Sequence, residues 1–148
     1  NRKIISRKPK KESSILPTIH GLLFDIAIAK NFQILPEFLV GGGRLDFLIS
    51  GVLKTKEIVS VCVEFKHAHS SKLLKGLLKQ LPKYMQVKGV NFGVYCVLFF
   101  KGPFFKKPEK YDLKDIKFHL DRKALKSGLK NIRILVFDLS YSIPPSRM

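Results

Sequence analysis

Residues 58–66 read IVSVCVEFK, and this segment decides the fold that the sequence predicts. Its β-branched density is typical of a strand near the middle of a sheet. Because successive side chains of a strand point to opposite faces, Glu64 and Lys66 share one face and Phe65 points to the other. Charged side chains at the end of a valine-rich strand cost free energy unless they are hydrated or used in chemistry. The segment therefore predicts a central strand that ends in candidate functional residues.

Helical and strand periodicities alternate along the rest of the chain. The predicted elements are a helix at 15–30, strands at 33–40, 45–50 and 58–66, a helix at 72–86, a strand at 93–100, a helix at 113–129 and a strand at 132–139. Tight turns at 41–43 and 54–57 make the first three strands antiparallel neighbours, whereas the later strands return through helices and favour parallel pairing. The predicted class is α/β: a mixed β-sheet flanked by helices, in the order αβββαβ(αβ).

Two of these helices carry local signals. In the first, apolar residues at steps of three and four predict one buried face, and Pro17 suits the first turn. That face comprises Ile19, Leu22, Leu23, Ile26 and Ala29. In the second, Ser70 or Ser71 can cap the start, and Pro82 predicts a kink because it lacks an N–H.

Charge defines the expected partners. The 148 residues include 28 Lys and Arg against 11 Asp and Glu, a formal net charge of +17. A domain this basic collects polyanions, so nucleic acid is the first expected partner and an anionic membrane surface the second. Residues 1–14 are rich in Lys and Arg and predict a flexible basic arm, whereas residues 15–148 predict a single domain.

Several classes are disfavoured by composition. The sequence has no apolar run of 18 residues and no signal-peptide pattern, so neither a membrane span nor secretion is expected. Cys62 and Cys96 lie in apolar surroundings and predict buried free thiols, which favours a reducing intracellular compartment. The chain starts at Asn1 instead of Met, which indicates a piece of a larger protein.

The charged residues suggest a metal site. Asp46 lies in the second predicted strand, and a short turn joins that strand to the one carrying Glu64, so the two carboxylates can converge. Carboxylates, waters and a substrate phosphate are the ligands that Mg²⁺ prefers. Lys66, on the same face as Glu64, could orient an attacking water or stabilise charge at phosphorus.

At these residues the sequence resembles a known family. Asp46 followed by the EFK of residues 64–66 is similar to the PD-(D/E)XK nuclease superfamily, whose fold is called restriction-endonuclease-like. The GGRLD of residues 42–46 and the spacing of Gln80 to Tyr84 look like members with a G-R-x-D strand and a Q-x-x-x-Y helix. The resemblance spans roughly residues 16–98, and the predicted order of elements is similar to the core of that fold.

The resemblance implies a role for each matching residue. Asp46 and Glu64 would bind Mg²⁺ or Mn²⁺, with a backbone carbonyl near Phe65 as a third ligand. Lys66 would be catalytic, and Gln80 would support the site. The implied activity is metal-dependent hydrolysis of phosphodiester bonds, with a DNA endonuclease as the first expectation. Because many members pair to cut both strands, a homodimer is one implied arrangement.

The sequence departs from the family pattern at two places. Leu45 stands where many members have Pro, and the first helix lacks the usual Glu, leaving His20 and Asp25 as the candidates nearby. The number of metal ions therefore stays open, with His20 as a candidate ligand. The missing Glu also favours an alternative: a catalytically weak or inactive module of the same fold that binds DNA or RNA within a larger assembly. A basic RNA-binding domain is a third interpretation, without a positive motif.

Nucleic-acid contacts are expected from a basic residue on the hairpin and from a row on the second helix. The candidates are Arg44, Lys72, Lys75, Lys79 and Lys83. Each has an ordinary alternative: the lysine row could be a solvated face, and Arg44 could pair with Glu37. Likewise Gln80 could be an ordinary helix-surface amide, and Tyr84 could be a core residue instead of a functional one.

Overall fold

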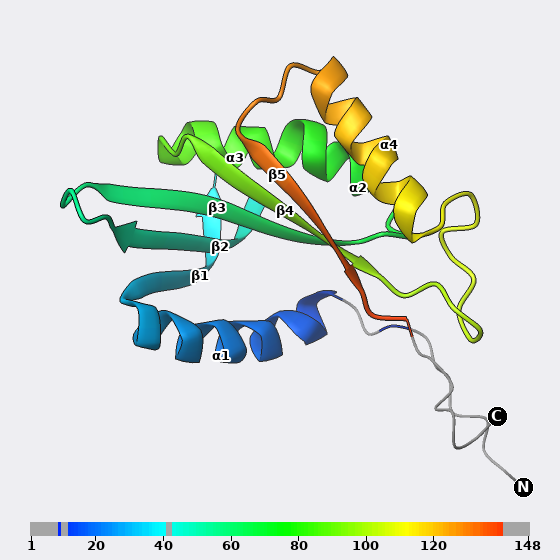
Figure 1. Ribbon diagram of the computed structural model, residues 1–148, viewed down its shortest axis with the longest axis horizontal. Coiled ribbons are helices and arrows are strands. Elements are labelled where there is room, and N and C mark those ends of the chain that lie inside the picture. Colours follow the sequence, from blue (N-terminus) through cyan, green and yellow to red (C-terminus); the bar gives the residue numbers. More distant parts are fainter. Residues whose placement is uncertain (1–8, 10–11, 41–42, 141–148) are drawn as a thin grey trace, which may run out of the picture.

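A computed structural model describes residues 9, 12–40 and 43–140 of the chain, and shows one five-stranded sheet between helices (Figure 1). The elements are α1 (Glu12–Lys30), β1 (Phe32–Val40), β2 (Gly43–Val52), β3 (Ile58–His67), α2 (Leu73–Lys75), the π-helical segment η1 (Gly76–Gln80), α3 (Leu81–Lys88), β4 (Phe92–Phe99), α4 (Leu113–Lys126) and β5 (Ile132–Asp138). The strands lie in the sheet in chain order, from β1 to β5.

The sheet is mixed, as the sequence predicts. β1 pairs with β2 and β2 with β3 in antiparallel fashion, whereas β3–β4 and β4–β5 are parallel. Val40 pairs with Gly43 across the predicted hairpin, whose residues 41–42 lie outside the described part. The second turn is closed by the Lys56 N–H, which donates to the carbonyl of Leu53, with Lys56 at a φ of 67°. The α/β class and the pairing directions are therefore confirmed.

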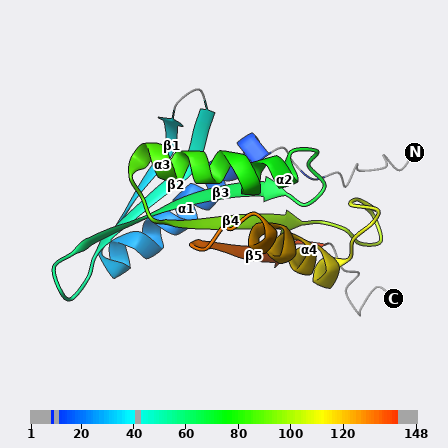
Figure 2. The ribbon, with the colours of Figure 1, turned by 90° about the horizontal axis from the view of Figure 1, so that it is seen from above.

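The two faces of the sheet carry separate apolar clusters. One lies under α1 and includes Phe47, Val63 and Phe65; the other lies under α2, η1, α3 and α4 and includes Cys62 and Tyr95. Figure 1 shows α1 on one side of the sheet and the other helices on the opposite side. Seen from above, α2 and α3 run along β3 while α4 lies over β5 (Figure 2). The predicted alternation in β3 is thus confirmed, with Phe65 facing away from the layer that Cys62 contacts.

The first helix differs from its prediction in extent. It begins at Glu12, so residues 12–14 belong to α1 and not to a flexible arm, and Pro17 lies inside the helix instead of in its first turn. The rest of the predicted arm, residues 1–8 and 10–11, lies outside the described residues.

The buried face of α1 also differs. Leu22 and Ile26 were expected inside, but 65% and 57% of their surfaces are exposed, whereas Ala27 is buried. Ile19 packs against the cluster under α1, as predicted. The central part of this helix is apolar on more than one side, so spacing alone does not decide which side meets the sheet.

The predicted helix at 72–86 is three consecutive segments. Within η1 the helix widens, and the N–H of Leu81 donates to the carbonyl of Gly76, five residues back. Pro82 follows directly, and its missing N–H and ring disturb the regular hydrogen-bond ladder. Ser70 is not the N-cap; its hydroxyl accepts the N–H of Lys72, which occupies the cap position.

The last helix ends at Lys126, three residues before the predicted end. Gly128 follows with a φ of 73°, a left-handed conformation that stops a helix at little steric cost.

Cys62 and Cys96 are free and buried, as predicted. Burial raises the pKa of Cys62 to about 11 and that of Cys96 to about 12, which keeps both thiols protonated near neutral pH. Among the residues that the structure describes, no helix combines the length and apolarity needed to cross a membrane.

Candidate active site

Asp46 and Glu64 adjoin the end of the pairing between β2 and β3. The pairing ends at Phe47 with Val63, and Asp46 and Glu64 are the next residues on the two strands. Because Phe47 and Val63 both face α1, the alternation of each strand turns Asp46 and Glu64 toward α2, η1 and α3. Both carboxylates are buried, with 9% and 4% of their surfaces exposed. The convergence of the two carboxylates that the short turn predicts stays a prediction.

The pair lies where the hairpin of β1 and β2 leaves β3. Figure 2 shows the far end of this hairpin turning away from β3. At this fork the backbone N–H of Phe65 donates to Oδ2 of Asp46 at 2.7 Å, in a buried position. The hydrogen bond holds the Asp46 carboxylate against the backbone of β3, next to Glu64. A charged acceptor makes such a bond stronger than a neutral one.

Lys66 lies on the same face of β3 as Glu64, beneath the π-helical segment η1. A β-carbon built on Gly76 would be 3.1 Å from Cε of Lys66 and 2.5 Å from the hydroxyl oxygen of Tyr95. Glycine at this position therefore lets η1 approach the sheet closely above Lys66. The two carboxylates and the ammonium group thus come from two adjacent strands and share one layer.

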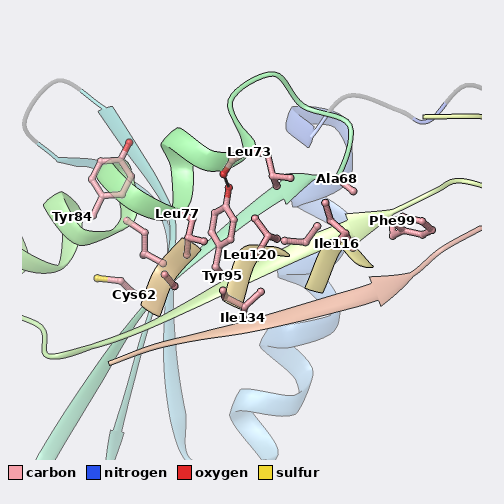
Figure 3. Close-up of a cluster of buried hydrophobic side chains, with 13 residues drawn as sticks. Cys62, Ala68, Leu73, Leu77, Tyr84, Tyr95, Phe99, Ile116, Leu120 and Ile134 are labelled. Carbon is pink, nitrogen blue, oxygen red and sulfur yellow. Dashed lines mark hydrogen bonds between the residues drawn. The ribbon is translucent and has the colours of Figure 1, made fainter. Parts of the chain in front are cut away.

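Tyr95 is a residue of this layer that the sequence analysis missed. It pairs with Glu64 in the parallel register of β3 and β4, and its side chain is fully buried. Its hydroxyl donates to the carbonyl of Leu73 at 2.6 Å, the dashed line in Figure 3. The available signal was a hydroxyl-bearing side chain within the apolar strand GVYCVLFF at residues 93–100. Tyr95 therefore fixes the distance between α2 and β4, the strand next to the one that carries Glu64.

Gln80 and Tyr84 lie on the helical segments above the sheet. Gln80 is the last residue of η1 and is half-buried, so its supporting role in the site stays a prediction. Tyr84 is buried in the cluster under α3 and appears there beside Leu77 in Figure 3. Of the two interpretations open for Tyr84, the structure places it in the core.

The first helix carries His20 and Asp25, the two candidates for the place of the missing Glu. His20 stacks on Phe47, with ring centroids 5.9 Å apart and planes at 6°. Asp25 is exposed on the same helix. The role of His20 as a metal ligand stays a prediction.

The predicted nucleic-acid contacts lie in different places. Arg44 belongs to β2, but its side chain is outside the described part of the structure. The four lysines of the second helical region are all exposed on the side away from the sheet: Lys72, Lys75, Lys79 and Lys83. They form a row along α2, η1 and α3, named the lysine row below, above the layer that holds Glu64 and Lys66.

The donor set at the fork suits a hard divalent cation. Within the described residues no group of three or more His, Cys, Asp or Glu side chains surrounds a single point. Mg²⁺ needs only one or two carboxylates, since waters, a carbonyl and substrate oxygens complete its shell. Asp46, Glu64 and the carbonyl of Phe65 are such a set. The residues present therefore fit the ion that the resemblance implies.

Comparison with known proteins identifies a family without an assigned activity. A family model described as a domain of unknown function (DUF8371) matches residues 2–102. The chain belongs to this family, and the matched region includes every element from α1 to β4. No curated protein and no solved structure matches the chain. The candidate site lies wholly inside the family region, whereas α4 and β5 lie beyond it.

Proposed function

We propose that this chain is a divalent-metal-dependent nuclease domain of the restriction-endonuclease-like fold, acting on phosphodiester bonds and first of all on DNA. The observation that supports the proposal is that Asp46 and Glu64 are both buried beside the end of the β2–β3 pairing, where the N–H of Phe65 donates to Oδ2 of Asp46. Lys66 follows two residues after Glu64 and therefore shares its face of β3. Burying two neighbouring carboxylates costs free energy, because both lose hydration and repel each other. A protein that keeps such a pair beside a lysine has the groups that phosphodiester hydrolysis requires.

Asp46, Glu64 and the carbonyl of Phe65 would hold Mg²⁺ or Mn²⁺. When bound, such an ion would neutralise charge on the phosphate and lower the pKa of a bound water. Lys66 orients the attacking water and stabilises the negative charge that grows on the phosphate oxygens. Water forms a new bond to phosphorus, the bond to the leaving ester oxygen breaks, and that oxygen takes up a proton. Gln80 and Arg44 are assigned to holding the phosphate.

The phosphodiester approaches from the fork. Asp46 and Glu64 are buried, and the pairing of β2 with β3 ends beside them, at Phe47 and Val63. The lysine row lies above the same layer, so it is placed to hold the backbone of a strand that enters there. Contacts of this kind give affinity without reading sequence.

The test is hydrolysis of plasmid DNA and of labelled oligonucleotides with Mg²⁺, Mn²⁺ or EDTA. We expect cleavage with either ion, none in EDTA, and a rate at least about 100-fold lower for Glu64→Gln and for Lys66→Ala, in line with the loss of one electrostatic catalytic group. Glu57→Gln and Lys54→Ala, both on the exposed turn between β2 and β3, are matched controls that should cleave like the parent. A Glu64→Gln protein that cleaves at the parental rate refutes the proposal.

A second candidate function is a nucleic-acid-binding module with weak or lost catalysis. The departure from the family pattern in the first helix favours it, because this sequence lacks the usual Glu there. This candidate predicts binding that persists in EDTA, with no cleavage under any metal. The same assay separates the two functions.

A further inference from the structure

A groove of about 470 Å³ lies along α4, away from the candidate active site. It is lined by one stripe of the helix and by two residues of the preceding loop: Lys110, Tyr111, Asp115, Phe118, His119, Arg122, Lys123 and Lys126. The helical members recur at steps of three and four, so they share one side of α4. Lys117, whose ammonium donates to the carbonyl of Ile134 in β5, lies on the opposite side of the helix. Figure 1 shows α4 and this loop at one edge of the molecule.

The groove is strongly basic. Four cationic side chains line it, from Lys110, Arg122, Lys123 and Lys126, against the single carboxylate of Asp115. Like charges this close repel one another, and an anion that enters the groove relieves that repulsion. The groove therefore suits a ligand with more than one negative charge.

The groove also presents aromatic faces. Tyr111 stacks on His119 with ring centroids 4.7 Å apart, and 64% of the Phe118 surface is exposed. The guanidinium of Arg122 lies 5.8 Å from the centre of the Phe118 ring. Burial lowers the pKa of His119, and Lys123, Lys110 and Arg122 lower it further. Flat apolar rings thus alternate with cations along one side of α4.

From this alternation we infer that the α4 groove binds single-stranded nucleic acid, with phosphates on its cations and an unpaired base on Phe118. The inference rests on the proposed function and deepens it by naming the substrate class. Base faces are accessible only where bases are unpaired, and alternating cations and aromatic rings are how proteins hold single strands without reading sequence. A duplex keeps its base faces stacked inside the helix, so it offers the exposed ring no face on which to stack.

The groove belongs to the same layer as the candidate active site. The inward side of α4, through Ile116, Leu120 and Ala124, packs in the cluster that also contains Leu77 and Tyr95. One strand could therefore contact α4 and the lysine row while remaining on one side of the sheet. The groove also lies beyond the region that the family model matches.

The test is binding of a fluorescent DNA or RNA octamer, measured by anisotropy in EDTA so that no cleavage occurs. Phe118→Ala should weaken binding at least about fivefold, the lower end of what one lost base–aromatic stack costs. Lys123→Ala should reduce the slope of log affinity against log salt by about 0.7, the value for one phosphate of a single strand. Leu125→Ala and Lys114→Ala are matched controls, since both are exposed on α4 outside the groove.

A direct reporter is available because the chain contains no tryptophan. Phe118→Trp places the only indole in the groove, and a stacked base should quench its fluorescence as the octamer is titrated. Leu125→Trp places the indole outside the groove and should show no such quenching. Far-ultraviolet circular dichroism of each variant checks that α4 is retained.

Several outcomes overturn the inference. The first is that Phe118→Ala and Leu125→Ala bind the octamer with equal affinity. The second is that a mononucleotide binds as tightly as the octamer. The third is that a duplex octamer binds as tightly as the single strand and loses as much affinity in Phe118→Ala. Failure of the proposed function is distinguishable: a Glu64→Gln protein that cleaves like the parent removes the nuclease assignment but leaves the octamer result standing.

Discussion

At the fork between β2 and β3, the side chain of Asp46 takes the place of a strand partner. Its Oδ2 accepts the N–H of Phe65, beyond the last recorded backbone pair of the two strands. The same residue belongs to the proposed metal site, so one side chain would both close the sheet locally and bind the ion. Stability and activity should therefore respond differently to substitution of Asp46.

Asp46→Ala removes the acceptor of a buried N–H, so we expect the free energy of unfolding to fall by about 1–3 kcal/mol. Asp46→Asn retains an oxygen acceptor and should lose less than about 1 kcal/mol, although both variants should lose cleavage. Urea denaturation measures the first effect and the plasmid assay the second. Asp121→Ala, on an exposed ion pair of α4, should change stability by no more than about 0.5 kcal/mol. Equal stabilities of Asp46→Ala and Asp46→Asn would contradict this role for the hydrogen bond.

At the scale of the element, η1 is the segment that brings a helix close to the candidate site. Gly76 leaves room for the hydroxyl of Tyr95 and for the stem of Lys66, and Tyr95 in turn donates to the carbonyl of Leu73. Local widening of a helix to π geometry is frequent at functional sites. The close approach depends on the absence of a single β-carbon.

Gly76→Ala should therefore destabilise the protein, by about 1–3 kcal/mol, because the new methyl group would lie 2.5 Å from the Tyr95 oxygen. Gly21→Ala in α1 meets nothing within 4 Å and should instead stabilise the protein by about 0.5–1 kcal/mol, the usual gain in a helix. Thermal or urea denaturation of both variants measures the change in the free energy of unfolding, which should be negative for Gly76→Ala and positive for Gly21→Ala.

Tyr95→Phe provides the second half of this test. It removes the oxygen that the Gly76→Ala methyl group would meet, so the double variant should lose less stability than the sum of the two single variants. Additive losses would show that the clash does not set the position of η1.

At the scale of the whole molecule, charge is the dominant feature. The net charge is +17, and eight of the 28 Lys and Arg residues lie on two basic surfaces in the layer opposite α1, four on the lysine row and four on the α4 groove. Both surround the layer that holds Glu64 and Lys66. Binding to nucleic acid should therefore depend steeply on salt, since each neutralised phosphate releases counterions.

Replacing the four lysines of the lysine row with Gln should reduce the slope of log affinity against log salt for duplex DNA by about 0.9 for each lysine that contacts a phosphate. All four side chains are exposed, so the fold should be retained. The matching Lys→Arg variant keeps the charges and should keep the slope. An unchanged slope in the Gln variant would mean that this row is only a solvated face.

Much of the candidate site could be predicted because it depends on local geometry. The period of two in residues 58–66 was enough to place Glu64 and Lys66 on one face, and the short turn was enough to make β2 and β3 antiparallel neighbours. The Asp46–Phe65 hydrogen bond could not be predicted, because it depends on where β2 leaves β3. Tyr95 was missed because its contact with α2 joins residues far apart in the chain.

By itself, the sequence determined the order of helices and strands, their antiparallel and parallel pairing, the burial of both cysteines and the basic character of the surface. These features follow from side-chain alternation, turn residues and composition, all of which act over a few positions. Only the tertiary structure decided which side of α1 is buried, how η1 widens above Lys66, and that rings and cations of α4 line one groove. Those features depend on how separate elements pack against each other, and many packings are compatible with the same local pattern.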